Sequence, residues 1–122
     1  MHLNEIQIFE NGINVASEAT CYSKTSGWSG NPACLNDGII GTYPSTCRSH
    51  SNNNNAGNYD VCVFDEPRDV DRVVVHPFND PTRTWMTDRI SDLTLEIFAD
   101  YDSAAGAGIG LLDSASMDSF SR

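Results

Sequence analysis

Residues 3–9, Leu-Asn-Glu-Ile-Gln-Ile-Phe, alternate apolar and polar side chains and place Ile6 and Ile8 on one face. A period of two is typical of a β-strand, because successive side chains of a strand point to opposite faces. Similar segments, rich in β-branched or aromatic residues and bounded by Gly, Pro, Asn or Asp, occupy 59–64 (Tyr-Asp-Val-Cys-Val-Phe), 70–76 (Val-Asp-Arg-Val-Val-Val-His) and 93–98 (Leu-Thr-Leu-Glu-Ile-Phe). The sequence therefore predicts an all-β chain.

The rest of the chain supports the same fold class. No window keeps apolar residues at helical spacing for three turns, and residues 15–22 are expected to supply another short strand. Several short strands separated by turn residues favour a β-sandwich or a barrel. Residues 23–51 are dominated by Ser, Thr, Gly, Asn and Pro, and so long a loop predicts a functional role or an organising ligand.

The length of 122 residues fits one domain. We expect the β-sandwich to span residues 1–102. The Ala-, Gly- and Ser-rich segment 103–122 is expected to be a weakly ordered tail, or one extra strand built on the apolar residues Ile109, Leu111, Leu112 and Phe120.

The chain is strongly acidic, with 7 Lys and Arg against 17 Asp and Glu and a formal net charge of −10. This charge argues against nucleic acid and against anionic membrane surfaces as partners. It is compatible with cation binding, and equally with a surface that only keeps the protein soluble. No apolar run approaches the twenty residues of a membrane span. Because an alternating strand pattern begins at Leu3, we expect no signal peptide in this segment.

The four cysteines, Cys21, Cys34, Cys47 and Cys62, leave two interpretations open. They can form two disulfides in any of three pairings, or they can be buried free thiols that act as small apolar residues. None belongs to a Cys-x-x-Cys pair, which argues against a zinc site.

Four stretches resemble a known family when taken in order. They are 14–20 (Asn-Val-Ala-Ser-Glu-Ala-Thr), 35–38 (Leu-Asn-Asp-Gly), 49–51 (Ser-His-Ser) and 71–97, which contains Asp-Arg-Ile-Ser-Asp-Leu-Thr-Leu-Glu-Ile at its end. Their order and spacing resemble the discoidin-like, galactose-binding superfamily, and within it the F-type lectins, over roughly residues 3–100. The resemblance implies an eight-stranded jelly-roll β-sandwich with binding loops at one end.

The resemblance also implies a structural calcium ion. In the family, an Asp at an Asp-Gly turn and a Glu in the last strand hold the ion together with backbone carbonyls, and Asp37 and Glu5 match these two residues. Calcium takes six to eight oxygen ligands, and the expected carbonyl donors are those of Cys34, Ile39, Thr46 and Asn4. The alternative is that Asp37-Gly38 is an ordinary turn and Glu5 an exposed strand residue.

Glu5 lies at the start of the chain, although the family's closing Glu lies in its last strand. We therefore expect the chain to behave as a circular permutant, with its N-terminal strand closing the sheet beside residues 93–98. Chain termini often lie close together, so such a rearrangement is tolerated.

The family's fucose-binding members hold the sugar with one His and two Arg, whose N–H groups donate to hydroxyls and the ring oxygen. His50 matches the His and Arg89 the second Arg, while residues 78–80 read Phe-Asn-Asp where the first Arg is expected. Arg83 or Arg48 would take its place. His50 could instead be a solvated loop residue, and Arg89 could pair with a neighbouring Asp.

Aromatic residues near these positions complete the expected sugar site. Trp85 or Trp28 would stack against the apolar face of the sugar. The alternative for Trp85 is a packing role at the bottom of the sandwich.

These observations favour a lectin-like module that binds fucose- or galactose-type sugars weakly, strengthened by oligomers or tandem domains. Its expected location is extracellular or at the cell surface, as part of a longer protein. The alternative is a non-catalytic adhesion or structural module whose sugar site has decayed. An enzyme is not expected, because the three histidines lie in separate segments and no catalytic motif is present.

Overall fold

The computed structural model describes residues 1–27, 30–51, 57–83 and 93–117. These residues form β-strands and two 3-10 helices: β1 (His2–Glu10), β2 (Ile13–Asn14), η1 (Ala16–Glu18), β3 (Thr20–Ser23), η2 (Pro32–Asn36), β4 (Ser49–His50), β5 (Asp60–Val63), β6 (Arg72–Pro77), β7 (Leu93–Asp102) and β8 (Ala107–Met117). The prediction of an all-β chain is confirmed. No helix in the described ranges has the length and apolar character needed to cross a membrane.

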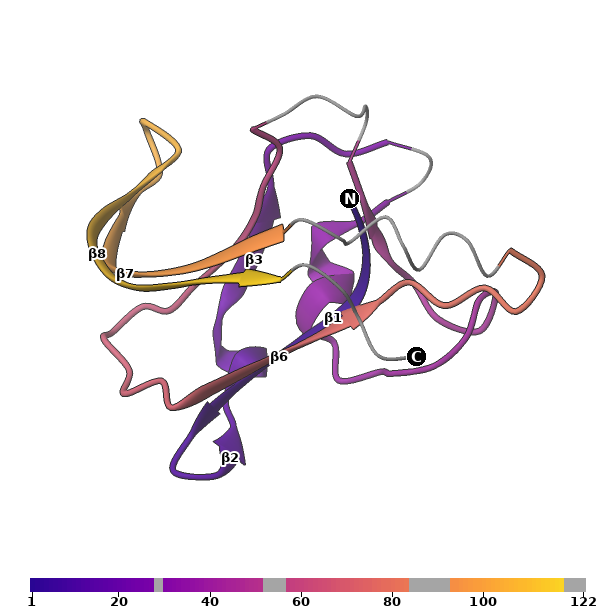
Figure 1. Ribbon diagram of the computed structural model, residues 1–122, viewed down its shortest axis with the longest axis horizontal. Helices are drawn as coiled ribbons and strands as arrows, with labels where there is room; N and C mark the ends of the chain where they lie inside the picture. Colours follow the sequence, from indigo (N-terminus) through magenta and orange to yellow (C-terminus); the bar gives the residue numbers. More distant parts are fainter. Residues whose placement is uncertain (28–29, 52–56, 84–92, 118–122) are drawn as a thin grey trace.

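Strand β1 is the centre of the largest sheet. It pairs antiparallel with β6 along one edge, from Leu3 opposite Pro77 to Phe9 opposite Arg72. Its other edge is shared by β4, which pairs with the start of β1, and by β2, which pairs with its end. Figure 1 shows β1 and β6 side by side in the middle of the molecule.

The prediction that the N-terminal strand lies beside residues 93–98 is wrong. Strand β1 pairs with β6, whereas residues 93–98 belong to β7, which pairs antiparallel with β8 from Leu93 opposite Met117 to Asp102 opposite Ala107. The Asp102 side chain favours this hairpin, because it accepts hydrogen bonds from the backbone N–H groups of Ala104 and Ala105 in the turn. A short turn also costs less closure entropy than pairing with a strand at the far end of the chain. Residues 107–117 thus form a strand.

The segment at 15–22 also differs from the single expected strand. Residues 16–18 form η1, and β3 begins only at Thr20. The Asn14 side chain explains the break, because its Oδ1 accepts hydrogen bonds from the backbone N–H groups of Ile8 and Ala16 and bends the chain between them.

Both disulfides form, which resolves the open pairing. Cys21 in β3 is bonded to Cys62, the residue directly opposite it in β5. Cys34 in η2 is bonded to Cys47 in the loop that precedes β4. The core lies between these elements, in two clusters of buried residues that comprise Leu3, Cys21 and Leu35, and Ile8, Val15 and Ala16.

The β7–β8 hairpin differs from this core. It curves away from the other strands at the left of Figure 1. One face of β7 is partly buried and the other exposed, whereas the apolar residues Ile109, Leu111 and Leu112 of β8 are all exposed. Gly108 lies directly beneath the Phe98 ring, where a side chain would collide with the ring.

Candidate functional site

The start of β1 carries an irregularity that buries two polar side chains in succession. Leu3 lies opposite Pro77 and Glu5 lies opposite His76, so β1 has one extra residue, Asn4, between these two pairs. Such a bulge re-aims side chains, and bulges are frequent at functional sites. As a result Asn4 is 2% exposed and Glu5 is 1% exposed.

Both side chains bind the loop that follows η2. Glu5 Oε1 accepts a hydrogen bond of 3.0 Å from the backbone N–H of Gly38. Asn4 Oδ1 accepts one of 3.1 Å from Gly41 N–H, and its Nδ2 donates at 3.3 Å to the Cys47 carbonyl. Together with the Cys34–Cys47 disulfide, these bonds fasten residues 37–47 against β1.

Glu5 is electrostatically unusual. Burial of its carboxyl group raises its pKa from 4.5 to about 7, the Gly38 N–H opposes this shift, and the neighbouring Asp37 carboxylate adds to it. Its second oxygen, Oε2, has no hydrogen-bond partner among the described residues. A buried carboxylate oxygen without a donor is costly, because no interaction replaces its lost hydration.

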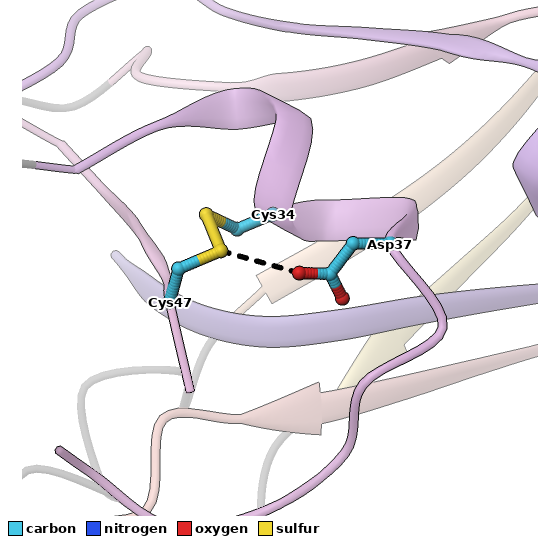
Figure 2. Close-up of side chains that lie close together, drawn as sticks. All are labelled: Cys34, Asp37 and Cys47. Atoms are coloured by element: carbon cyan, nitrogen blue, oxygen red, sulfur yellow. Dashed lines mark hydrogen bonds between the residues drawn. A yellow bond between two sulfur atoms is a disulfide. The ribbon is translucent and has the colours of Figure 1, made fainter. Parts of the chain in front are cut away.

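Asp37 ends η2 and faces the second disulfide, as Figure 2 shows. Its Oδ1 accepts a 2.9 Å hydrogen bond from Ile39 N–H, and its Oδ2 lies 3.2 Å from Cys47 Sγ. A disulfide sulfur carries no proton, so Cys47 donates no hydrogen bond to Oδ2 in this contact. For the same reason Cys34, Asp37 and Cys47, which lie close together, cannot act as a thiolate metal site.

The oxygen atoms of Glu5, Asp37 and Thr46, in contrast, suit a hard cation. The Oγ1 of Thr46 is also buried without a partner among the described residues. Carboxylate and hydroxyl oxygens that lack donors are the type of ligand that calcium takes. The structure brings the six residues expected for calcium to one region, which comprises the start of β1, the end of η2 and the following loop: Asn4, Glu5, Cys34, Asp37, Ile39 and Thr46.

A pocket lies next to this loop. Six side chains line about 230 Å³ of empty space, a volume that includes open solvent: His2, Tyr43, Arg48, Phe78, Asp80 and Arg83. The strands bring these residues together, because His2 begins β1, Arg48 precedes β4 and Phe78 follows β6, and both β4 and β6 pair with β1.

Two aromatic rings lie beside the Arg48 guanidinium. Its central carbon lies over the rings of Tyr43 and Phe78, 5.2 Å from each centroid. Phe78 also stacks on His2, with centroids 3.9 Å apart and the rings 10° from parallel. Cation–π contact of this kind holds a guanidinium plane in a fixed orientation.

Asp80 supplies a carboxylate to the same pocket. It is 4% exposed, and its Oδ1 accepts hydrogen bonds from both the N–H and the hydroxyl of Thr82. These hydrogen bonds lower the pKa of Asp80, and the nearby Arg83 lowers it further. Asp80 therefore stays ionised and can accept hydrogen bonds from a ligand.

The residues expected for sugar binding are only partly brought together. Arg48 and Arg83 line the pocket, and His50 lies just behind it, with its ring 4.2 Å from that of His2 and its Nδ1 2.7 Å from the Ser51 carbonyl. Arg89 and Trp85 lie outside the described residues, as does Trp28.

Sequence reasoning missed four of the pocket residues, His2, Tyr43, Phe78 and Asp80. One signal was present, because residues 78–80 occupy the position where the family's first Arg is expected. His2 and Tyr43 had no signal of their own, since strand pairing alone brings these distant residues together.

Comparison of the chain with protein-family models, with curated proteins and with solved structures found no match. The pocket and the loop beside it are therefore the features that indicate a function.

Proposed function

We propose that this domain is a non-catalytic, lectin-like module that binds carbohydrate in the pocket between Tyr43, Arg48 and Phe78. The observation that carries the proposal is the combination of two guanidinium groups, an ionised carboxylate and aromatic rings in one open pocket. Sugars offer hydroxyls that accept from Arg and donate to Asp, and a C–H face that packs on rings. Fucose- and galactose-type sugars are the expected ligands.

A structural calcium ion is part of the proposal. Its ligands would include Glu5 and Asp37, and the buried Oε2 of Glu5, which has no donor in the part of the chain that the structure describes, supports it. The loop that would hold the ion continues into Tyr43 and Arg48, and Tyr43 N–H donates at 2.9 Å to the Asn79 carbonyl beside Phe78. An ion bound there would therefore fix two walls of the pocket.

The absence of catalysis is also a proposal. Each histidine is engaged in packing or in a local contact: His2 stacks on Phe78, His50 Nδ1 contacts the Ser51 carbonyl, and His76 Nε2 contacts Gln7 Oε1 at 2.9 Å. Burial lowers the pKa of His76, but Gln7 is no partner for acid–base chemistry. These contacts support binding rather than proton transfer.

The jelly-roll form of the sandwich, the extracellular location and the multivalent assembly complete the proposal. The sheet of β1 and the pair β3–β5 share the core around Leu3 and Cys21, which supports two layers. Two disulfides are compatible with an oxidising compartment. Oligomers or tandem domains would raise the avidity of a weak site.

Titration calorimetry with a panel of monosaccharides, in calcium, tests the proposal. Arg83→Gln removes an exposed pocket cation with little risk to the fold. Arg72→Gln is the matched control, because Arg72 is also exposed but lies over Phe9 at the far end of β1. We expect Arg83→Gln to weaken sugar binding about tenfold, or about 1.4 kcal/mol, and the control to bind normally. Equal binding by both variants would contradict the assignment of this pocket.

One observation favours a second candidate, an adhesion or structural module of the same fold. The Arg48 guanidinium lies against the rings of Tyr43 and Phe78, so this arginine could serve packing alone. In that case no sugar in the panel would produce heat at millimolar concentration, while the melting temperature would show an intact fold.

A further inference from the structure

We propose that the preferred ligand is a glycoside with an apolar aglycone, an alkyl or aryl group. The aglycone lies on three exposed residues of the loop beside the pocket, Ile39, Ile40 and Tyr43, which we call the apolar patch. This inference rests on the carbohydrate-binding function proposed above and specifies the class of its ligand.

The first argument is the exposure of large apolar side chains next to the pocket. Ile39 and Ile40 are 54% and 50% exposed, and Tyr43, which lines the pocket, is also exposed. Single apolar residues are normal on a protein surface, whereas these three lie within five consecutive residues. Exposed apolar groups that gather in this way are typical of a ligand-binding surface.

The second argument is that the loop is held in place, so the exposure of the two isoleucines is not that of a loose chain. Backbone N–H groups on both sides of them, those of Gly38 and Gly41, donate to the buried side chains of Glu5 and Asn4. An apolar surface that is fixed before binding loses little entropy when a ligand covers it.

The third argument is the lack of charge in this loop. Residues 38–47 contain no Asp, Glu, Lys or Arg, although 20% of the chain is charged and its net charge is −10. A loop that only keeps the protein soluble is expected to carry charge. Covering an uncharged, apolar surface displaces water without the cost of desolvating an ion.

The apolar patch lies within reach of a ligand in the pocket. Tyr43 belongs to both, and three peptide units separate it from Ile40, so the two Cα atoms are at most about 11 Å apart. An aglycone that leaves the pocket over the Tyr43 ring therefore meets the isoleucines. An apolar group suits this surface better than a second sugar, whose hydroxyls would lose water there without gaining a charged partner.

Titration calorimetry with paired glycosides tests the inference: methyl and hexyl galactoside, and methyl and hexyl fucoside, all in calcium. The members of a pair share the sugar and differ only in the length of the alkyl chain. We expect one hexyl glycoside to bind about tenfold more tightly than its methyl partner, because methylene groups on the patch leave water. This ratio should not fall between ~50 mM and ~500 mM salt, since salt screens charges and not apolar contacts.

A pair of isoleucine variants locates the alkyl group. Ile40→Ser removes part of the patch, and Ile13→Ser is the matched control, because Ile13 is 67% exposed but pairs with the far end of β1. Ile40→Ser should lower the hexyl-to-methyl ratio to about threefold or less while the affinity for the methyl glycoside stays the same. Ile13→Ser should change neither.

The possible failures of the two proposals differ. Equal affinity for hexyl and methyl glycosides would overturn the inference and leave the carbohydrate-binding function standing, whereas binding of no glycoside would overturn that function itself. Hexanol that binds as tightly as the hexyl glycosides would also overturn the inference, because the patch would then hold an alkyl chain without the sugar. Sedimentation that depends on concentration in the native protein and not in Ile40→Ser would assign the patch to a second copy of the chain instead.

Discussion

The region around β1 and the β7–β8 hairpin differ in which kinds of side chain they bury and expose. Around the start of β1, polar side chains are buried, among them His2, Asn4 and Glu5. In the hairpin, apolar side chains are exposed, with Leu111 at 55% and Leu112 at 69%. Globular proteins usually bury apolar groups and expose polar ones, so each region departs from the rule in its own direction.

The difference shows where to look for function. Burying a polar group costs free energy unless it finds a partner, and Glu5 Oε2 and Thr46 Oγ1 have none among the described residues. An exposed leucine costs little free energy, because the fold only lacks the stabilisation that burial of this side chain would have contributed. The β1 region is therefore held together by two disulfides and polar contacts at some energetic cost, which is typical of a ligand site.

The largest effect is expected from the Cys21–Cys62 cross-link between β3 and β5. It closes a loop of 41 residues, and removing it by Cys21→Ser with Cys62→Ser should lower the free energy of unfolding by about 4 kcal/mol. Urea denaturation of the variant and the native protein measures the difference. A loss below about 1 kcal/mol would mean that the β1 region does not depend on this bond.

The next effect is expected in the core of the same region. Leu35 in η2 is 0% exposed and contacts the cluster of Leu3 and Cys21. Leu35→Ala leaves a cavity and should lower the free energy of unfolding by about 3 kcal/mol in the same denaturation experiment. A much smaller loss would show that the surrounding residues can collapse into the space.

The sequence predicted where the strands of this region lie along the chain, but not which strands pair with each other. The alternation of apolar and polar residues identified β1, β5, β6 and the start of β7, because the period of a strand is visible among residues that are adjacent in sequence. It could not identify β6 as the partner of β1, since an alternating strand can pair with any other. The same limit applies to the candidate site. Asp37 and Glu5 are proposed as calcium ligands from the resemblance, while His2 and Phe78 meet only through the pairing of β1 with β6.

Calcium should produce the clearest specific effect. If Glu5 binds the ion, adding calcium to protein treated with a chelator should raise the melting temperature, with a stabilisation of about 2.7 kcal/mol at a hundred times the Kd. Glu5→Gln keeps an oxygen that can accept from Gly38 N–H but lacks the charge. This variant should not respond to calcium, and an unchanged response would remove Glu5 from the site.

The pH dependence without calcium provides an independent check of the buried carboxyl group. The folded-state pKa of Glu5, about 7, exceeds its ordinary value of 4.5. A raised pKa contributes stability that is fully present below pH 4.5 and is lost as the pH rises through 7. The loss should approach about 3 kcal/mol in chelator at pH 8, and Glu5→Gln should remove this component. A Glu5→Gln pH profile that parallels that of the native protein would assign the slope to other groups.

The smallest effect is expected in the hairpin, and it completes the comparison with Leu35. Leu111 is 55% exposed, so Leu111→Ala removes the same atoms as Leu35→Ala but opens no cavity. The free energy of unfolding should change by less than about 0.5 kcal/mol. A loss close to that of Leu35→Ala would mean that Leu111 is covered in solution, by a second copy or by another part of the chain. Sedimentation of the native protein at two concentrations would then distinguish these cases, since only self-association depends on concentration.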